Sequence, residues 1–168
     1  MPSLVNMETT TVITVSDRSA AGARADLSGP VLASALSAAG YSVRVVIVPD
    51  GVESVAQALR AAISSGSRLV VTTGGTGIGP RDHTPEATAA VIDRELPGVA
   101  ELLRAEGRTH SAHAALSRGI AGVVDPAEGS RGTLIVNLPG SPSAAREGVD
   151  IVIGLAGHVL DQLAGGDH

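Results

Sequence analysis

The sequence predicts an α/β protein of three layers, in which helices cover both faces of a mostly parallel sheet and a smaller strand pair lies in the second half. Short β-branched runs alternate with segments whose apolar residues recur at helical spacing. The runs are apolar almost throughout, as strands buried on both faces are. This βαβαβ order implies parallel strands joined by right-handed crossovers. The length of 168 residues suits one domain, which we expect to span residues 1–168.

Three strands and two helices are predicted in the first half. The strands cover residues 10–16, 42–48 and 68–73, and a polar loop covers residues 17–25. The first helix begins near Asp26 or Ser28, either of which can cap it, and Gly40 stops it. The second helix begins at Val52 and ends at Gly66.

In the second half of the chain, the predicted elements are interrupted more often. Thr84 and Pro85 predict a helix start, with threonine as the cap and proline at the first helical position. This helix breaks at Pro97, resumes, and ends at Gly107. The remaining elements are a short helix over 110–118, strands over 120–124 and 133–138, and a long helix that Ser141 or Ser143 caps and that runs to about Leu163.

The composition excludes several kinds of chemistry. All 12 basic residues are arginine and cysteine is absent, so lysine Schiff bases, P-loop lysines, cysteine nucleophiles, thiolate metal sites and disulfides are impossible. The net charge of −5 and a single aromatic residue, Tyr41, argue against binding nucleic acid by charge or stacking. Met1–Glu8 shows no signal-peptide pattern, and Val149–Leu160 is too short and polar to span a bilayer. We therefore expect a cytoplasmic protein without a membrane partner.

Residues that can carry chemistry follow four of the strands. In an open parallel sheet, ligands bind beyond the carboxyl ends of the strands. These ends are followed by Ser16 and Asp17, by Asp50, by residues 74–82, and by Pro139-Gly140-Ser141. Carboxylates, hydroxyls and two glycine-rich loops therefore converge on one edge of the predicted sheet.

The loop over residues 74–82 (GGTGIGPRD) is predicted to bind an anion. Four glycines in six residues leave backbone N–H groups free to face a negative charge. Pro80 and Arg81 stand where a P-loop needs lysine followed by serine or threonine, and Pro80 also replaces the third glycine of dinucleotide-binding loops. The loop is therefore neither a P-loop nor a dinucleotide-binding loop. The alternative to an anion-binding loop is a plain flexible loop.

Asp50 and Asp82 form a candidate metal site. Two carboxylates at adjacent strand ends can hold one Mg²⁺, with phosphate oxygens and water completing its octahedron. Taken alone, Asp50 also fits a Pro-Asp-Gly turn. Asp82 also fits an ion pair with Arg81 or a helix cap.

Arginine, serine and histidine supply further candidates. Arg81 or Arg18 could neutralise phosphate charge in a substrate, although either could equally lie on the surface. Ser141 stands at a helix N-terminus, which attracts anions, and could equally be an ordinary cap. We expect His110 and His113 to be solvent-exposed, because no third metal ligand follows at a useful spacing.

The motifs resemble those of a known family. They occur in the order Thr14-Val15-Ser16-Asp17, Gly74-Gly75-Thr76-Gly77, Pro80-Arg81-Asp82, Thr84-Pro85-Glu86-Ala87, Leu116-Ser117-Arg118, Ala121-Gly122 and Asn137-Leu138-Pro139-Gly140-Ser141-Pro142. The sequence is similar to molybdenum cofactor biosynthesis proteins of the Mog/MoaB type, which include the G domain of gephyrin. The similarity extends from about Thr10 to Leu163, and GGTGxxPRDxTPEA is its most specific segment.

The resemblance implies a molybdopterin adenylyltransferase. In that family Mg-ATP and molybdopterin bind one pocket, and the terminal phosphate of the pterin attacks the α-phosphate of ATP to give adenylyl-molybdopterin and pyrophosphate. Asp50 and Asp82 would be the metal-binding and catalytic acids. The resemblance further implies that Gly74, Gly75, Thr76 and Gly77 cradle the nucleotide, and that the pocket is lined by Ser16, Asp17, Ser117, Pro139, Gly140 and Ser141.

Two other functions use the same residues. A non-catalytic paralogue would bind molybdopterin or nucleotide as a binding or assembly module. A metal-dependent phosphohydrolase would release phosphate rather than pyrophosphate. The family also implies a homotrimer and a downstream molybdate-insertion protein as a partner. The link between residues 121 and 133 is longer than the short turn of the family.

Overall fold

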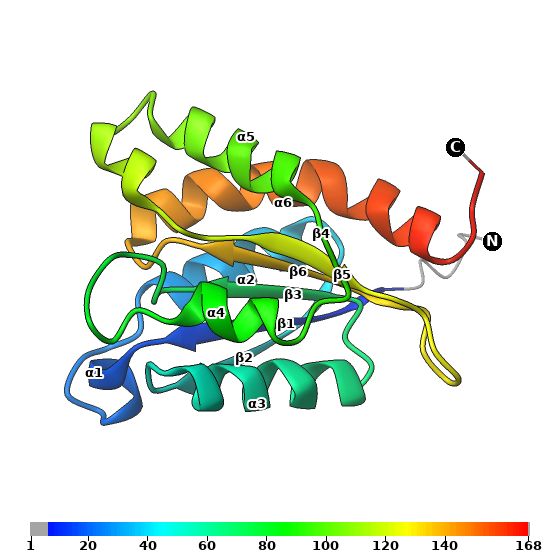
Figure 1. Cartoon of the computed structure of the whole chain (residues 1–168), viewed down its shortest axis with the longest axis horizontal. Coiled ribbons are helices and arrows are strands. Elements are labelled where there is room, and N and C mark those ends of the chain that lie inside the picture. The colour runs from blue at the N-terminus through cyan, green and yellow to red at the C-terminus, as the bar shows by residue number, and fades with distance from the viewer. Residues whose placement is uncertain (1–6, 168) are drawn as a thin grey trace.

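The structure is a computed structural model that describes residues 7–167 (Figure 1). Six strands of these residues form one sheet in the order β2-β1-β3-β6-β5-β4. The strands are β1 (Thr9–Val15), β2 (Ser42–Val48), β3 (Leu69–Thr73), β4 (Arg94–Glu95), β5 (Ala121–Val124) and β6 (Thr133–Leu138). The predicted domain of residues 1–168 and the search of Met1–Glu8 for a signal peptide include residues 1–6 and 168, which lie outside the described residues.

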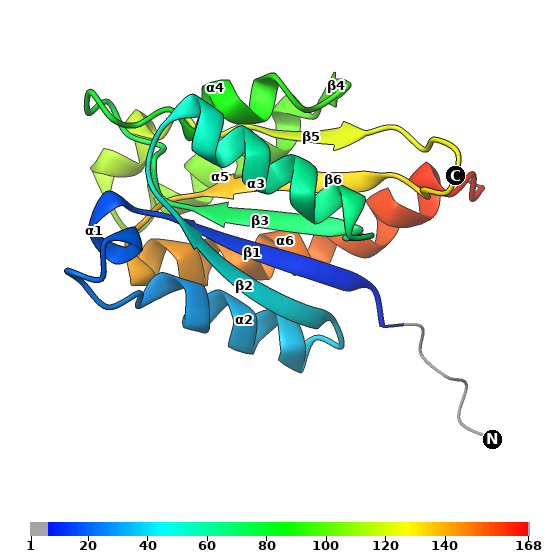
Figure 2. The same ribbon diagram turned by 90° about the horizontal axis from the view of Figure 1, so that it is seen from below.

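Helices cover both faces of the sheet, which confirms the predicted three-layer α/β architecture. One face carries α2 (Ser28–Ala38), α5 (Pro97–Gly107) and α6 (Pro142–Leu163), and the other carries α3 (Val52–Ser64) and α4 (Thr84–Ala89). Figure 2 shows α3 and α4 on the opposite side of the strands from α2 and α6. Among residues 7–167, no helix combines the length and the apolar character needed to cross a membrane.

Four neighbouring strands run parallel. β1 lies between β2 and β3 and pairs with both in parallel, and β3 pairs in parallel with β6. β5 runs antiparallel to β6, and β4 antiparallel to β5. The sequence predicted a smaller strand pair in the second half but not its direction. The long link between β5 and β6 is a hairpin with a bridge between Ala127 and Ser130. The carboxyl ends of the four parallel strands therefore share one edge.

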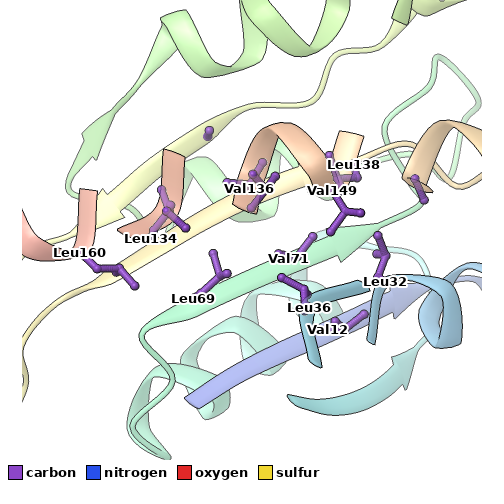
Figure 3. Packing of buried hydrophobic residues seen from close by; sticks show 14 of the residues in the cluster. Val12, Leu32, Leu36, Leu69, Val71, Leu134, Val136, Leu138, Val149 and Leu160 are labelled. Atoms are coloured by element: carbon purple, nitrogen blue, oxygen red, sulfur yellow. The ribbon is translucent and has the colours of Figure 1, made fainter. Parts of the chain in front are cut away.

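The central strands send alternate side chains into two cores. Leu69 and Val71 of β3 face α2 and α6, whereas Val70 faces α3. β6 has the same pattern, with Leu134 on the side of α2 and α6 and Ile135 on the side of α3. Each of these side chains is at most 2% exposed, and Figure 3 shows the first core. Because the sheet is packed on both faces, the loops at its edge start from fixed positions.

Three local predictions differ from the structure. The polar loop predicted after the first strand begins with a short helix, α1 (Asp17–Ala20), because Ser16 Oγ accepts a hydrogen bond from the Ser19 N–H. The stretch predicted as one interrupted helix contains β4, whose two residues become a strand only through pairing with β5. Thr84 does not cap α4, because its hydroxyl instead donates to the Gly74 carbonyl oxygen at 2.9 Å.

The start of α2 differs from the predicted caps Asp26 and Ser28, since its N-cap residue is Leu27, whereas the start of α6 confirms Ser141 as the cap. Asp26 Oδ1 accepts a hydrogen bond from the Gly29 N–H at 2.9 Å, and Asp26 Oδ2 accepts one from Thr14 Oγ1 at 2.8 Å. Asp26 precedes Leu27, the N-cap residue of α2, and its carboxylate binds the first turn of the helix and anchors it to β1. At the start of α6, Ser141 Oγ accepts a hydrogen bond from the Ala144 N–H at 3.1 Å. The helix therefore begins at the loop that follows β6, next to the edge where the candidate site lies.

Candidate active site

The segments that follow the four parallel strands meet at one edge of the sheet. Ser16 follows β1, Asp50 follows β2, Gly74 follows β3 and Pro139 follows β6. The Gly74 N–H donates to the Leu138 carbonyl oxygen at 3.1 Å. This bond ties the glycine-rich loop to the end of β6, so that the two loops expected to bind anions lie side by side.

The start of the loop over residues 74–82 requires glycine. Gly74 and Gly75 have φ angles of +100° and +67°. A Cβ on Gly74 would stand 2.3 Å from the Val15 carbonyl oxygen, and a Cβ on Gly75 would stand 2.2 Å from Thr84 Oγ1. The loop therefore lies directly against the end of β1 and the start of α4.

The backbone groups of this loop differ in how they are paired. Thr84 donates to the carbonyl oxygens of residues 74–75, and Arg118 donates to those of residues 76–77. By contrast, the N–H groups of residues 75–78 meet no acceptor among the described residues. Unpaired backbone donors clustered in a concave loop are suited to bind an anion.

Two adjoining cavities open at this edge. The larger has a volume of about 710 Å³ and lies between the glycine-rich loop, α5, the 3₁₀ helix η1 (Ala112–Leu116) and the start of α6. The smaller has a volume of about 400 Å³ and lies between the ends of β1 and β2 and the start of α2. Five residues line both cavities and form their common border: Gly74, Gly75, Asp82, Gly140 and Ser141. The two cavities therefore adjoin at these five residues.

The structure brings most of the predicted site residues to these cavities. In addition to the border residues, the smaller cavity is lined by Ser16 and Asp50, and the larger by Thr76, Gly77, Ser117 and Pro139. Asp17 and Arg81 line neither of the two cavities. Their role as substrate contacts stays a prediction, and their contacts point to a different task.

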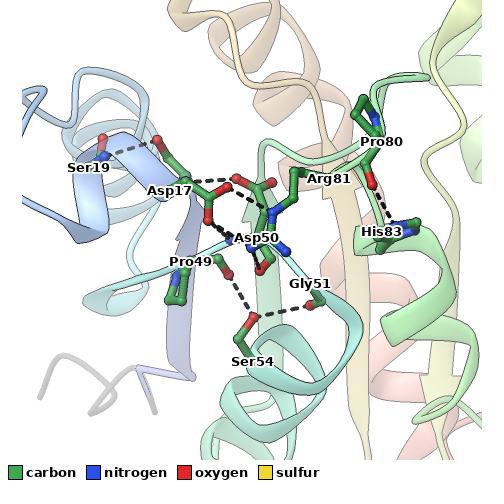
Figure 4. A network of polar contacts seen from close by, with 10 residues as sticks. Asp17, Ser19, Pro49, Asp50, Gly51, Ser54, Pro80, Arg81 and His83 are labelled. Carbon is green, nitrogen blue, oxygen red and sulfur yellow. Dashed lines mark hydrogen bonds and ion pairs between the residues drawn. The ribbon is translucent and has the colours of Figure 1, made fainter.

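Asp17, Asp50 and Arg81 form a polar network beside the smaller cavity (Figure 4). The Asp17 N–H donates to Asp50 Oδ2 at 2.9 Å, and the Asp50 N–H donates to Asp17 Oδ1 at 3.1 Å. Arg81 donates to both carboxylate oxygens of Asp17 at 3.1 Å and to the Asp50 carbonyl oxygen at 2.9 Å. Hydrogen bonding to Arg81 lowers the pKa of Asp17, whereas burial raises the pKa of Asp50. Arg81 thus balances the charge of Asp17 and leaves the Asp50 carboxylate for another cation.

Asp50 and Asp82 both line the smaller cavity, but not because their strands are adjacent. β1 separates β2 from β3, which corrects the expectation of neighbouring strand ends. The glycine-rich loop closes the gap, since a Cβ on Gly75 would stand 3.3 Å from Asp50 Oδ1. After burial and the charge of Asp17, the charge of Asp82 also raises the pKa of Asp50. The two carboxylates are therefore close enough to interact.

Each of these two carboxylates has one oxygen that could ligate a magnesium ion. Oδ2 of Asp50 accepts from the Asp17 N–H and Oδ2 of Asp82 accepts from the Gly79 N–H, each at 2.9 Å. Oδ1 of each accepts no hydrogen bond from the described residues. Within residues 7–167 no three His, Asp or Glu side chains gather into a metal-binding group. Two carboxylate oxygens suit Mg²⁺, which commonly takes its other ligands from water and substrate phosphates.

Some cavity residues were missed by the sequence analysis. Glu147 of α6 and His110 line the larger cavity, with 3.6 Å between Glu147 Oε1 and His110 Nδ1. His110 is exposed as expected, yet it lies at the cavity. Arg24 lines the smaller cavity and forms no ion pair with the described residues. For Arg24, only its position in the loop after β1 could have suggested a role at the site. For Glu147, no motif in the neighbouring sequence indicates such a role.

The chain is similar to several known proteins. Residues 11–158 match the family described as "Probable molybdopterin binding domain". A molybdopterin adenylyltransferase of Pyrococcus furiosus is 42% identical over 150 residues, which cover 89% of this chain and 87% of that protein. A molybdenum cofactor biosynthesis bifunctional protein of Synechococcus elongatus is 39% identical over 159 residues, which cover 94% of this chain and 48% of that protein. The chain thus spans about half the length of this bifunctional relative.

The fold is also similar to that of solved structures. The crystal structure of the tungsten cofactor synthesizing protein MoaB from Pyrococcus furiosus has a TM-score of 0.86 and 39% identity, with 95% of this chain and 98% of that chain covered. The α/β fold, including the antiparallel strands beside β6, is therefore shared with this protein.

Proposed function

This chain belongs to the family of molybdopterin binding domains, and we propose that it is a molybdopterin adenylyltransferase that transfers AMP from Mg-ATP to the phosphate of molybdopterin. In this reaction an oxygen of the terminal phosphate of the pterin forms a bond to the α-phosphorus of ATP. The bond from that phosphorus to the oxygen bridging to the β-phosphate breaks, and pyrophosphate leaves.

The common border of the two cavities carries this proposal. Gly74, Gly75, Asp82, Gly140 and Ser141 line both cavities. Transfer between two substrates requires that each has its own binding place while the reacting phosphates meet. A phosphohydrolase requires a place for one phosphate ester and water, so two joined cavities favour transfer.

The residues at the border suit a reaction that depends on positioning and charge. The unpaired N–H groups of residues 75–78 and the N-terminus of α6 at Ser141 would hold phosphate oxygens. Asp50 and Asp82 would hold Mg²⁺, which when bound neutralises phosphate charge. The attacking phosphate is already an anion, so no base with a special pKa is needed. This explains how a chain without lysine and cysteine could be such an enzyme.

Each cavity also has charged side chains away from the border, among them Glu147 in the larger cavity and Arg24 in the smaller. Glu147 in the larger cavity could accept hydrogen bonds from ring or amino N–H groups, which both pterin and adenine have. Arg24 in the smaller cavity could bind phosphate oxygens. We therefore assign one substrate to each cavity.

The assembly and the fate of the product complete the proposal. We infer a homotrimer that passes adenylyl-molybdopterin to a molybdate-insertion protein in the cytoplasm. Val45 and Ile47 on the edge strand β2 are 39% and 42% exposed, so self-association would have apolar surface to cover. Light scattering coupled to size-exclusion chromatography tests the trimer, and a monomer at micromolar concentration would contradict it.

A pyrophosphate assay tests the activity. The protein is incubated with molybdopterin, Mg²⁺ and ATP, and pyrophosphate and adenylyl-molybdopterin are measured. We expect pyrophosphate only when the pterin is present. Binding of both substrates without product would instead indicate the non-catalytic module, and phosphate released without pterin would indicate a phosphohydrolase.

A matched pair of variants links this activity to the site. Asp50→Asn removes a carboxylate of the smaller cavity, whereas Asp125→Asn removes one that pairs with Arg94 beyond the end of β5. We expect pyrophosphate formation to be lost in Asp50→Asn and kept in Asp125→Asn. Equal activity of the two variants would remove Asp50 from the reaction.

A further inference from the structure

Arg118 lies outside both cavities but contacts the loop that borders them. Its backbone N–H donates to the Thr76 carbonyl oxygen at 2.9 Å, and its Nε donates to the Gly77 carbonyl oxygen at 2.8 Å. One terminal nitrogen of the guanidinium donates to the Asp82 carbonyl oxygen at 2.7 Å, and the other forms an ion pair with Glu86 of α4. A single residue thus makes four contacts with the loop and with the helix that follows it.

These contacts join the two ends of a turn. The Gly79 N–H donates to Asp82 Oδ2 at 2.9 Å, and the Asp82 N–H donates to the Gly79 carbonyl oxygen at 3.1 Å, which closes the tip. Thr76 and Gly77 precede the tip, and Asp82 ends it. Because Arg118 binds the backbone on both sides, it holds the two ends of the turn at a set distance.

Arg118 also sets the direction of the unpaired N–H groups. In a trans peptide unit the C=O and N–H bonds point in opposite directions. The carbonyl groups of Thr76 and Gly77 point to Arg118, so the N–H groups of the same two peptide units, which belong to Gly77 and Ile78, point away from it. Gly77 and Ile78 line the larger cavity and Arg118 does not. The donors are therefore turned toward the side where a ligand would lie.

The segment that carries Arg118 is itself held in place. A terminal nitrogen of Arg104 on α5 donates to the carbonyl oxygens of Gly119 at 3.0 Å and of Ser117 at 3.4 Å. The Arg118 side chain is 37% exposed, lines neither cavity, and bonds to the loop and to Glu86 of α4. A ligand in either cavity would therefore meet the residues that Arg118 holds rather than Arg118 itself.

We propose that Arg118 is a positioning residue that aims the Gly77 and Ile78 N–H groups and the Asp82 carboxylate at the common border of the two cavities. This inference rests on the proposed function, because it assumes that a phosphate group binds at the border. The planar guanidinium donates in three directions at fixed angles, which the single ammonium group of lysine cannot reproduce.

Substitution of Arg118 tests the inference with pyrophosphate as the probe. Arg118→Gln, Arg118→Lys and Glu86→Gln are compared with wild type and with Arg94→Gln, which removes another exposed arginine–carboxylate pair. Binding of pyrophosphate with Mg²⁺ is measured by calorimetry, kcat and KM for ATP by the pyrophosphate assay, and folding by thermal unfolding. We expect both Arg118 variants to lose about 10–100-fold in pyrophosphate affinity and in kcat/KM, the range seen when groups that orient ligating residues are removed. Glu86→Gln removes one contact of four and should lose less, and Arg94→Gln should match wild type.

Several outcomes would overturn the inference. Full affinity in Arg118→Lys would show that charge alone suffices. If the loss of pyrophosphate affinity is fully accounted for by the fraction of unfolded protein, and the folded molecules bind normally, Arg118 has only a general structural role. If Arg118→Gln does not fold, Arg118→Lys decides by the same measurements.

The proposed function can fail separately. If wild type binds pyrophosphate but forms no adenylyl-molybdopterin, the proposed function is wrong, while weaker binding by the Arg118 variants would still support the positioning role. If wild type does not bind pyrophosphate at all, both proposals fall.

Discussion

Asp50 and Asp82 line one cavity although the strands that precede them are not neighbours in the sheet. β1 lies between β2 and β3, and the loop after β3 reaches back over the end of β1 to bring Asp82 toward Asp50. The loop can make this approach because Gly74 and Gly75 adopt positive φ angles and lack side chains where Val15 and Thr84 pack against them. The carboxylate pair therefore depends on glycine as much as on aspartate.

Asp82→Asn should keep the fold and most of the nucleotide affinity but lose turnover. The amide keeps the shape of the side chain and one oxygen for the Gly79 N–H, but it removes the negative charge that would hold Mg²⁺. We expect kcat to fall by about 100-fold or more, the scale of losing one preorganised electrostatic group. Steady-state kinetics and ATP titration measure this, with Asp125→Asn as the control. An unchanged kcat would exclude Asp82 from the mechanism.

Glu147→Gln and Arg24→Gln should separate the two substrates. The two residues line different cavities and neither belongs to their common border. We expect each variant to raise the KM of only one substrate, and the affected substrate to differ between the two variants. The increase should be about tenfold, since the loss of one charged hydrogen bond costs about 1.5–3 kcal/mol. KM values for ATP and molybdopterin are measured for both. If both variants raise KM for the same substrate, the assignment of one substrate to each cavity is wrong.

Gly75→Ala should destabilise the protein more than Gly22→Ala. Both glycines have positive φ, +67° and +73°, so alanine is strained at either position by about 1–2 kcal/mol. A Cβ on Gly75 would also stand 2.2 Å from Thr84 Oγ1, whereas a Cβ on Gly22 would meet nothing within 4 Å. Urea unfolding measures both, and equal losses would show that Thr84 does not hold the loop.

Glu86→Gln should show a pH-dependent effect on stability. Hydrogen bonding to Arg118 lowers the pKa of Glu86 from its ordinary value of 4.5, so the folded state favours the ionised form. The ion pair therefore stabilises the fold fully above the pKa of the unfolded chain, and this contribution is lost as pH falls through the lowered pKa of the folded state. Because Glu86 is 44% exposed, the difference at pH 7 should be below about 1 kcal/mol.

Unfolding by urea at pH 7 and at pH 3 measures the difference between wild type and Glu86→Gln. Glu101→Gln on α5 is the control, since Glu101 is an exposed carboxylate that forms no ion pair with the described residues. A difference that stays constant between the two pH values would contradict the ion pair as its cause.

Local pattern alone was enough for the fold class and for the candidate residues that follow the parallel strands. The alternation of apolar strands and amphipathic helices predicts the layers, because a parallel sheet buries both faces and leaves a readable run of apolar residues. The glycine-rich loop and the acidic residues after the strands are likewise visible, since turn chemistry is encoded within a few residues. The helix start at Thr84 was misread because its hydroxyl serves the Gly74 carbonyl oxygen instead of its own helix.

What only the tertiary structure decided involves residues that meet across long stretches of chain. The order β2-β1-β3, the pairing that makes a strand of Arg94–Glu95, and the packing of α5 beside α6 that brings Glu147 into a cavity all arise from contacts between distant segments. Arg118 is the clearest case, since its four contacts are with residues 76–86. The residues next to Arg118 in the chain do not indicate that it makes these contacts. Periodicity and turn preferences describe how a segment folds locally, whereas the free energy of packing decides which segments meet, and the chemistry of this edge depends on both.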